Sequence, residues 1–401
     1  MSHKKRVLFF AEPATLAHVV RPIVLASSLD RAHYEVSVAT GADFRRFVEA
    51  AGLEVRDLWC IGTRAYLAAV SAGRPVFPFA VLERYVADDL RVIGEVRPDV
   101  IVGDFRLSLA VSARLAGIPY LAISNAYWSP FAQARFEVPV HAATRLFGVG
   151  FTDSVFGLLR PLIFAQHSLP MHRLCRKHGR PSLGFDLLRI FSEGDVTLFA
   201  DVPELVPTTD SGQAGRYEYI GPITWSPPGS VPASLNEAGD SRALVYISLG
   251  SSGDSRLLRH VVNAVHAAGC RVAVGTATPI TDQDLGHVDV VQGMLPGNEM
   301  AAMAQLVICN GGSPGTHQAL QAGTPVLGIP ANLDQLLNMH FVTRSGAGLA
   351  IRADQVTSDR VGEMVQGLVH EASFRERAQA VRGWFGTCRA EERFPRAISG
   401  I

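Results

Sequence analysis

The sequence lacks most of the features that mark disulfide-rich, metal-binding, membrane-spanning and nucleic-acid-binding proteins. Its five cysteines are scattered and no Cys-x-x-Cys pair occurs, which argues against a disulfide framework or a metal cluster and favours a reducing cytoplasm. Lys plus Arg equals Asp plus Glu at 37 each, so the formal net charge is zero and no nucleic-acid partner is expected. No apolar run approaches the ~18 residues of a membrane span, so we expect no stable membrane insertion. The first apolar run, Val7 to Ala11, is interrupted by Glu12 and Pro13 too early for a signal peptide.

Short apolar runs alternate with helical patterns along most of the chain. Runs that are apolar on both faces predict buried strands of a parallel sheet, and their alternation with helices predicts an α/β protein. The expected strands cover 7–11, 35–39, 100–103, 120–124, 195–199, 243–249, 271–274, 288–291, 306–309 and 326–329. The expected helices cover 19–29, 43–51, 107–116, 257–268, 316–322, 361–369 and 374–384.

The length of 401 residues favours two domains, and a tract rich in Pro, Ser and Gly separates two similar α/β halves. We predict an N-terminal domain at 1–222, a linker at 223–241 and a C-terminal domain at 242–385. A tail at 386–401 could return to the N-terminal domain.

The most informative pattern lies in the stretch 306–338. An apolar strand is followed by a turn at 310–315 with three glycines, a serine and a proline, and then by a helix. Ser313 is suited to cap this helix and the proline after it to occupy the first position. Free backbone N–H groups and the positive end of a helix dipole bind phosphate, although most glycine turns of this kind serve shape only. Asp334 and Gln335 follow the next strand and suit sugar hydroxyls.

This layout resembles the donor signature of the family 1 glycosyltransferases, in which HGG-x-G-T-T-x-E-A-L is followed by A-G-x-P and DQ. Asn310 replaces the motif's His, Pro314 its next Gly, Gly315 its first Thr and Gln318 its Glu. The matching positions are Gly311, Gly312, Thr316, Ala319, Leu320, Ala322, Gly323, Pro325, Asp334 and Gln335. The resemblance covers nearly the whole chain. It implies the α/β GT-B fold, with two Rossmann-like domains facing each other across a cleft, the first binding the acceptor and the second the donor.

The resemblance also implies a set of donor-binding residues. Gly250 and Ser251 resemble the turn that touches the donor diphosphate, although a bare β–α turn is an equal alternative. Met294 stands where relatives stack an aromatic ring on the nucleobase, a contact that its polarisable sulfur could provide. The full donor set is Gly250, Ser251, Met294, Asn310, Gly311, Gly312, Ser313, Gly315, Thr316, Asp334 and Gln335. We expect no metal ligand, and no cofactor beyond a UDP- or dTDP-sugar as co-substrate.

Inverting sugar transfer needs a base that deprotonates the acceptor hydroxyl. The segment AHVVRP at 17–22 resembles the family's G-H-x-x-P with one extra spacing. A histidine at a helix N-terminus is disfavoured as a cation, so His18 suits a neutral base, with a polar loop residue as the alternative. Asp104 ends an apolar run and resembles the family's Asp that orients this base, with a helix N-cap as its alternative.

Acceptor contacts are expected from loops of the first half. Asn125, Tyr127 and Trp128 follow a strand end and are candidate acceptor-binding residues, although both aromatics could belong to the core. The Phe- and Arg-rich region 131–191 is where family members vary to fit acceptors. It is compatible with an apolar cleft that has a basic rim, with core helices that have a solvated basic face, or with contact to an anionic membrane.

Together these patterns predict a cytoplasmic, metal-independent, inverting glycosyltransferase that moves a sugar from UDP or dTDP to a hydroxyl of a small, largely apolar natural product. The alternatives are a non-catalytic GT-B protein that binds nucleotide sugars or assists a partner, and a nucleotide-sugar epimerase, which would need no acceptor. The expected partners are a nucleotide sugar and a small-molecule acceptor, with a homodimer as an open option.

Overall fold

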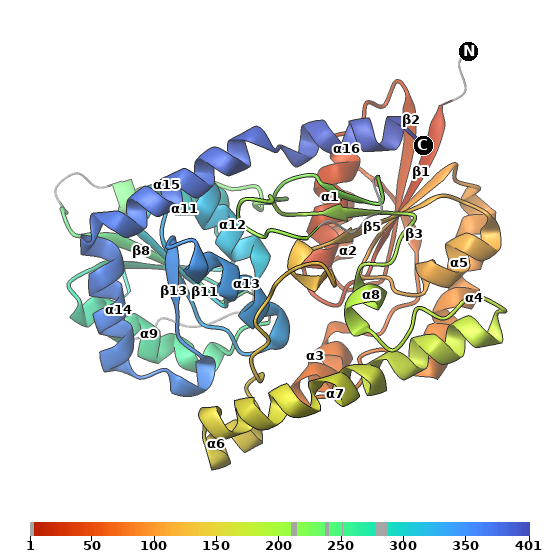
Figure 1. The fold of residues 1–401 in the computed structure, drawn as a ribbon. Helices are drawn as coiled ribbons and strands as arrows, with labels where there is room; N and C mark the ends of the chain where they lie inside the picture. Colours follow the sequence, from red (N-terminus) through yellow and green to blue (C-terminus); the bar gives the residue numbers. More distant parts are fainter. Residues whose placement is uncertain (1–3, 210–214, 237–239, 251, 277–284, 286–287) are drawn as a thin grey trace. The chain divides into compact units, whose positions relative to one another are not determined.

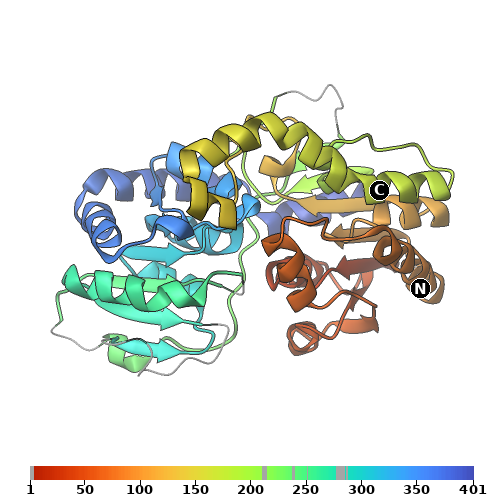
Figure 2. The same ribbon diagram turned by 90° about the horizontal axis from the view of Figure 1, so that it is seen from below.

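The computed structural model describes residues 4–209, 215–236, 240–250, 252–276, 285 and 288–401. The chain forms two compact units, of which the first contains 1–133, 158–223 and 388–401 and the second contains 134–157 and 224–387. In both units helices lie on the two sides of a parallel sheet (Figures 1 and 2). The α/β architecture predicted from the alternating apolar runs is therefore confirmed.

The first unit is built on a seven-stranded sheet in the order β3-β2-β1-β4-β5-β6-β7, in which every pair is parallel. The order reverses between β1 and β4, which lie side by side although a long segment separates them in sequence. In parallel sheets such a reversal opens a crevice at the carboxyl ends of the strands, where ligands bind. The strands are β1 (Lys5–Ala11), β2 (Tyr34–Thr40), β3 (Glu54–Asp57), β4 (Val100–Asp104), β5 (Tyr120–Ser124), β6 (Val196–Phe199) and β7 (Tyr217–Tyr219).

Helices cover both faces of this sheet with apolar side chains. One core cluster joins the sheet to α1 (Ala17–Ser27), α2 (Arg45–Ala50) and α16 (Ala390–Ser399). A second cluster joins the other face to α4 (Phe79–Val96) and α5 (Leu109–Ala116). The unit also contains α3 (Thr63–Ser71), α8 (Leu187–Phe191) and the 3-10 turn η1 (Ala126–Trp128).

The C-terminal segment 388–401, expected as a tail, packs within the first unit. Figure 1 shows α16 beside α1 and β1. The Phe394 ring lies 5.8 Å from the ring of Phe9 on β1. These buried contacts give the last helix a place in the core of the unit.

The segment 134–157 differs from the predicted boundaries, because it lies in the second unit and not in the N-terminal domain. Thr144 Oγ1 donates a hydrogen bond to Asp354 Oδ2 at 2.6 Å, and Arg352 Nη1 donates to the Val138 carbonyl at 2.7 Å. These contacts join residues far apart in sequence, so an assignment that follows chain order cannot find them.

The Phe- and Arg-rich region is helical, as expected, and contains α6 (Ala142–Phe147) and α7 (Val149–Lys177). The division between the units falls inside α7, after Gly157. One face of α7 is buried and the other exposes large apolar side chains, namely Phe151, Val155, Leu158, Leu159, Leu162 and Leu169. Although α7 is 29 residues long, no helix in the described part of the chain has the length and apolarity to cross a membrane.

The second unit has a six-stranded parallel sheet in the order β10-β9-β8-β11-β12-β13. Its order reverses between β8 and β11. The strands are β8 (Leu244–Ser248), β9 (Arg271–Gly275), β10 (Val290–Gln292), β11 (Leu306–Cys309), β12 (Val326–Gly328) and β13 (Gly348–Ala350). The helices α9 (Leu258–Ala267) and α14 (Ser358–His370) share one core cluster with the sheet. The other helices are α11 (Gly297–Met303), α12 (Ser313–Ala322), α13 (Leu333–Arg344) and α15 (Ala372–Thr387).

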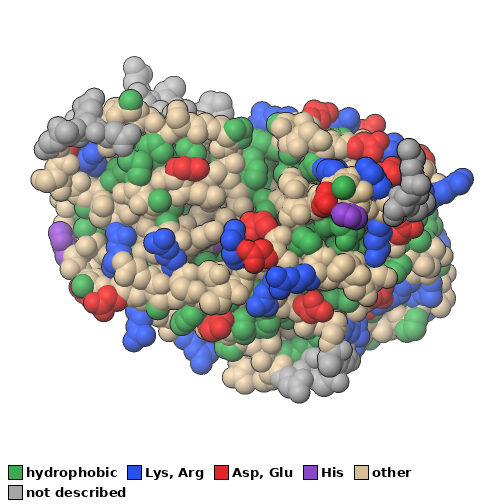
Figure 3. All heavy atoms as spheres, turned by 90° about the horizontal axis from the view of Figure 1, so that it is seen from above, with side chains coloured by type: hydrophobic (Ala, Val, Ile, Leu, Met, Phe, Trp, Pro, Cys, Tyr) green, Lys and Arg blue, Asp and Glu red, His purple; other side chains and the backbone are tan. Residues whose placement is uncertain are grey.

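The surface carries charges of both signs. On the face shown in Figure 3, Lys and Arg side chains lie among Asp and Glu side chains. This mixture agrees with the zero formal net charge of the sequence.

Candidate functional site

The strand reversal in the first unit brings His18 and Asp104 together. His18 is the second residue of α1, which follows β1, and Asp104 is the last residue of the neighbouring strand β4. The Glu12 N–H donates to the Asp104 carbonyl at 3.2 Å and joins the two strand ends. The predicted position of His18 at a helix N-terminus is confirmed.

The two side chains form a hydrogen-bonded pair. His18 Nδ1 lies 2.7 Å from Asp104 Oδ1, and the Asp104 side chain is completely buried. An anionic oxygen at this distance requires a proton on Nδ1, so the neutral imidazole has its lone pair on Nε2. The His18 side chain keeps 18% of its surface exposed, which leaves the ring accessible from solvent. This arrangement suits a general base.

A third residue, Arg21, completes the group and was not identified from the sequence. It lies one turn after His18 on α1 and its side chain is 6% exposed. Its Nε donates to Asp104 Oδ2 and its Nη2 to Asp104 Oδ1, both at 2.7 Å. Nη2 also lies 3.0 Å from His18 Nδ1. Because both nitrogens carry hydrogens directed at the same carboxylate, we interpret this short distance as a contact between two donors.

Asn125, a predicted acceptor residue, belongs to this same group. Its Oδ1 accepts from Arg21 Nη1 at 2.8 Å, and its Nδ2 donates to Asp201 Oδ2 at 3.1 Å. Asp201 Oδ2 also accepts from the N–H of Ala126 at 2.7 Å. Asn125 therefore connects the loop after β5 to the His18–Asp104 pair.

Aromatic side chains surround the imidazole of His18. The Phe105 ring stacks on it with the centroids 4.6 Å apart and the planes 10° apart. Tyr66 and Phe191 pack edge-on against Phe105, and Trp128 packs edge-on against Phe191. All four aromatic residues are only partly buried, so they give the surroundings of His18 an apolar surface.

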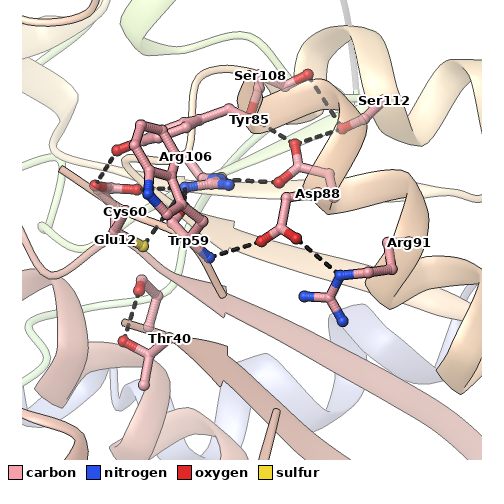
Figure 4. Close-up of polar contacts among 12 residues, drawn as sticks. Glu12, Thr40, Trp59, Cys60, Tyr85, Asp88, Arg91, Arg106, Ser108 and Ser112 are labelled. Carbon is pink, nitrogen blue, oxygen red and sulfur yellow. Dashed lines mark hydrogen bonds and ion pairs between the residues drawn. The ribbon is translucent and has the colours of Figure 1, made fainter. Parts of the chain in front are cut away.

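The position of Phe105 depends on an unusual backbone conformation. Its φ is 59°, in the left-handed region that bulky side chains rarely adopt. The next residue, Arg106, is completely buried and forms ion pairs at 2.9 Å with both Glu12 and Asp89 (Figure 4). We infer that these two ion pairs hold the turn that places Phe105 on His18.

The group around Arg106 is a buried polar network. Tyr85 donates to Glu12 Oε1 at 2.7 Å, and the hydroxyls of Ser108 and Ser112 donate to Asp89 at 2.6 and 2.9 Å (Figure 4). Burial raises the pKa of the Glu12 carboxyl, and the Arg106 charge opposes that rise. Burial likewise raises the pKa of the Asp89 carboxyl against the same arginine. A network of this kind is a rigid support and not an accessible reaction site.

The two predicted aromatic acceptor residues differ in their surroundings. Tyr127 is completely buried, which gives its side chain no open surface and agrees with the core alternative. Trp128 is partly exposed and packs on Phe191 with the ring centroids 4.8 Å apart. Of the two, Trp128 is therefore the better candidate for acceptor contact.

The strand reversal in the second unit brings the two predicted donor turns together. Gly250 follows β8 with a φ of 64°, and Asn310 follows the neighbouring β11. Asn310 Nδ2 donates to Ser252 Oγ at 3.1 Å, and Asn310 Oδ1 accepts from the Gly312 N–H at 3.0 Å. Asn310 therefore fixes both turns, and Ser252 is a residue of this site that sequence reasoning missed. Ser251 lies outside the described residues.

The turn before α12 corrects the prediction that Ser313 caps the helix. Gly312 is the N-cap and Ser313 the first helical residue, so Ser313 does not cap the helix. Thr316 is completely buried, its N–H donates to the Gly312 carbonyl, and its hydroxyl accepts from Asn338 Nδ2 at 2.9 Å. The hydroxyl also lies within donating distance of the carbonyls of Gly312 and Ser313, at 3.3 and 3.2 Å, and the role of Thr316 at the diphosphate stays a prediction. Ser313 and Gly315 occupy the first turn, where helical N–H groups lack partners within the helix.

Gly311 has a positive φ of 81°, and the space beside it is filled. A Cβ atom at this position would lie 2.7 Å from Met339 Cγ. Its carbonyl accepts from Asn338 Nδ2 at 2.8 Å. Asn338 and Met339 of α13 thus hold the glycine turn from behind, a role that the sequence pattern did not reveal.

Asp334 and Gln335, neighbours in sequence, have different surroundings. Gln335 is 2% exposed, and its Oε1 accepts from the N–H of Ala331 at 2.8 Å. It also forms a capping box with Asn332 at the start of α13, and its Nε2 donates to Ser252 Oγ at 3.3 Å. Asp334 is partly exposed in the first turn of the same helix. Gln335 therefore has a structural role in the loop, whereas the partly exposed Asp334 stays the predicted contact of the donor sugar.

The remaining predictions concern the nucleobase and a metal. Met294 is partly exposed and lies between β10 and α11, so the structure leaves its predicted contact open. The described residues contain no group of three His, Cys, Asp or Glu that could hold a metal. One Asp-x-Asp pattern at 282–284, which could offer paired carboxylates to a divalent cation, lies outside the described residues. Metal independence therefore stays a prediction from the resemblance.

Comparison with known proteins shows relatives over nearly the full length. The chain is 44% identical over 386 residues to a "PGL/p-HBAD biosynthesis glycosyltransferase" of Mycobacterium tuberculosis strain H37Ra, covering 96% of this chain and 90% of that protein. It is 43% identical over 385 residues to a "PGL/p-HBAD biosynthesis rhamnosyltransferase" of Mycobacterium bovis strain BCG, covering 96% and 85%. It is also 46% identical over 265 residues to an "Inactive PGL/p-HBAD biosynthesis glycosyltransferase" of the same organism, covering 66% and 72%.

The fold and the C-terminal sequence agree with these relatives. Residues 281–385 match the family "Erythromycin biosynthesis protein CIII-like, C-terminal domain". The solved structure of the spinosyn rhamnosyltransferase SpnG superimposes with a TM-score of 0.71 at 18% identity, covering 98% of this chain and 100% of that one. SpnG has also been solved with thymidine diphosphate and with the spinosyn aglycone. The chain therefore belongs to the glycosyltransferase family of the PGL/p-HBAD biosynthesis proteins and has the GT-B fold.

Proposed function

We propose that the protein is an inverting, metal-independent glycosyltransferase of the cytoplasm that moves a sugar from a UDP- or dTDP-sugar to a hydroxyl of a small, largely apolar acceptor. The observation that carries this proposal is the His18–Asp104 pair, 2.7 Å apart, whose imidazole is accessible and stacked on Phe105. An accessible base beside partly exposed aromatic rings suits an acceptor that has an apolar body and one reactive hydroxyl.

In the proposed reaction the acceptor hydroxyl transfers its proton to His18 Nε2. Its oxygen attacks the anomeric carbon of the donor sugar from the face opposite the diphosphate. The bond between the anomeric carbon and the diphosphate oxygen breaks, and the electron pair leaves with the diphosphate. One displacement of this kind inverts the configuration at the anomeric carbon.

The second unit supplies the features that a leaving diphosphate needs. Ser313 and Gly315 in the first turn of α12 lie at the positive end of the helix dipole, which favours an anion. Asn310 Nδ2 has a second hydrogen besides the one directed at Ser252. We assign the donor sugar's hydroxyls to Asp334, which is partly exposed near the same turn.

The comparisons support both ligand classes without identifying them for this chain. SpnG was solved with a thymidine nucleotide and with an aglycone, which are a donor-side and an acceptor-side ligand. The sequence departs from the family motif at Asn310, Pro314 and Gly315, and one relative is named inactive. A non-catalytic nucleotide-sugar-binding protein is therefore the second candidate.

A ligand screen followed by a transfer assay distinguishes the two candidates. The melting temperature is measured with UDP-, dTDP- and GDP-sugars, because a ligand at a hundredfold excess over its dissociation constant stabilises the protein by about 2.7 kcal/mol. The stabilising donor is then incubated with phenolic and polyketide acceptors, with and without EDTA. The proposal expects a glycoside with inverted anomeric configuration in both conditions. A stabilising donor that yields no product with any acceptor favours the non-catalytic candidate, and loss of product with EDTA contradicts metal independence.

A further inference from the structure

Arg21 is bound to the same carboxylate that positions His18. Two of its nitrogens donate to Asp104 at 2.7 Å, one to each carboxylate oxygen. A parallel two-bond contact between a guanidinium and a carboxylate is strong and fixes the geometry of both groups. Both side chains are buried, at 6% and 0% exposure, so solvent screens their charges only weakly.

Within the described part of the chain, the charged groups considered are those bonded to His18 or to its direct partners. Asp104 and Arg21 contact the imidazole directly, at 2.7 and 3.0 Å from Nδ1. Asp201 is one step further away and acts through Asn125. Glu12 touches Asp104 only through its backbone N–H, and its carboxylate is paired with Arg106. With His18 neutral, the three groups in direct contact have a net charge of zero.

A buried Asp104 without a counter-charge would favour the protonated imidazole, because an opposite charge within hydrogen-bond distance stabilises the cation. A protonated His18 cannot accept the proton of an acceptor hydroxyl. Arg21 removes this effect in two ways, since it neutralises Asp104 and places a positive nitrogen 3.0 Å from Nδ1. The cost is that Asp104 stabilises the imidazolium less once the proton has been transferred.

We propose that Arg21 is a positioning residue that neutralises Asp104 and keeps the imidazole of His18 unprotonated before the reaction. It also holds Asn125 in a fixed position relative to the His18–Asp104 pair. This inference rests on the proposed role of His18 as the base. It assigns Asp104 chiefly the task of orienting the ring, and it assigns Arg21 the task of setting the pH at which the ring becomes a base.

The test is a titration of His18 by NMR in the full-length protein labelled at histidine Cε1, with the His18 signal assigned from a His18→Gln variant. Arg21→Met removes the charge and keeps the apolar stem. The titration midpoint of His18 should then move to higher pH by about one unit or more, the effect expected of an uncompensated neighbouring carboxylate. Arg21→Lys keeps the charge, so its midpoint should stay near that of the parent. Arg91→Met, which removes an arginine paired with Asp88 and Glu95 on α4, is the matched control and should leave the midpoint unchanged.

The pH profile of kcat/KM distinguishes this inference from the proposed function. If His18 is the base, the acidic limb of the profile should move in Arg21→Met by the same amount as the NMR midpoint. If the NMR midpoint of His18 moves in Arg21→Met but the acidic limb of the kcat/KM profile does not, His18 is not the base. The electrostatic role of Arg21 still holds in that case. A folded Arg21→Met protein with the parent's midpoint overturns the inference about Arg21. If Arg21→Met does not fold, the same titration is made on Arg21→Gln. This variant keeps a hydrogen-bond donor for Asp104 without the charge, so the His18 midpoint should again move to higher pH.

Discussion

At the donor site, two adjacent residues lead to opposite expectations. Asp334 is partly exposed, so Asp334→Ala should weaken binding of the sugar nucleotide and leave free UDP or dTDP binding unchanged. Gln335 has its amide in the capping box of α13, so Gln335→Ala should lower the melting temperature through a loss of about 1 kcal/mol. Calorimetry with the sugar nucleotide and with the free nucleotide, together with thermal unfolding, separates the two effects. Equal weakening of both ligands by Asp334→Ala would place this residue at the phosphates instead.

Asn310 tests whether the departure from the family motif still supports a working site. Asn310→Ala removes a donor that we assign to the charged diphosphate, a loss of roughly 1.5–3 kcal/mol, or about ten- to a hundredfold in turnover. Asn310→His should retain or raise turnover, because a charged donor binds the diphosphate more strongly.

Part of any effect at Asn310 comes from its contact with Ser252, so Ser252→Ala is the matched control. This variant breaks the link between the two turns and leaves the Asn310 side chain in place. Turnover that falls equally in Ser252→Ala and Asn310→Ala would show that Asn310 only shapes the loop.

At the level of elements, the sequence predicted those that leave a strong local pattern. Buried parallel strands are apolar runs, so β1, β4 and β11 were all predicted within a few residues of their observed bounds. The helix α4 was not predicted, although its buried residues from Leu82 to Ile93 recur at the spacing of an amphipathic helix. Arg21, Asn338 and Ser252 were missed because their roles depend on contacts between strands and helices that sequence spacing does not encode.

The glycine turn before α12 gives a prediction at this scale. Gly311→Ala introduces a Cβ atom 2.7 Å from Met339 Cγ at a φ of 81°, so it should destabilise the protein by about 1–3 kcal/mol and weaken donor binding. Gly386→Ala in α15 is the control, because an added Cβ there meets no atom within 4 Å and an alanine favours the helix. Thermal unfolding of both variants checks this. A Gly311→Ala protein as stable as Gly386→Ala would show that the turn is not held as described.

At the scale of the whole molecule, the alternation of strands and helices predicts the two α/β units. It does not predict which unit each connecting segment belongs to. The segment 134–157 is joined to the second unit by Thr144 and Arg352, whose partners lie far away in sequence. The last helix was expected as a tail, and its buried Phe394 and Ile398 make it part of the core of the first unit. The assignment of 134–157 depends on long-range packing that chain order does not reveal, whereas the return of the tail to the first unit was among the expectations.

The cysteines give a prediction for the folded molecule as a whole. Burial raises the pKa of the Cys309 thiol to about 12, and it also raises the pKa values of the other four thiols. A thiol with a raised pKa has little thiolate at about pH 8, so the native protein should react slowly with iodoacetamide while the unfolded protein reacts at all five positions. A Ser154→Cys variant, with its thiol on the exposed face of α7, provides the reactive control. Mass spectrometry counts the modified thiols, and rapid alkylation of Cys309 in the native protein would contradict its burial.

The central claim is that His18 is the base of a sugar-transfer reaction, and the most direct measurement is the turnover of the parent and of His18→Ala with the same donor and acceptor. The account predicts that His18→Ala loses most of the activity, on the order of a hundredfold or more, while calorimetry gives an unchanged affinity for the donor. Near-normal turnover in a folded His18→Ala protein would contradict it.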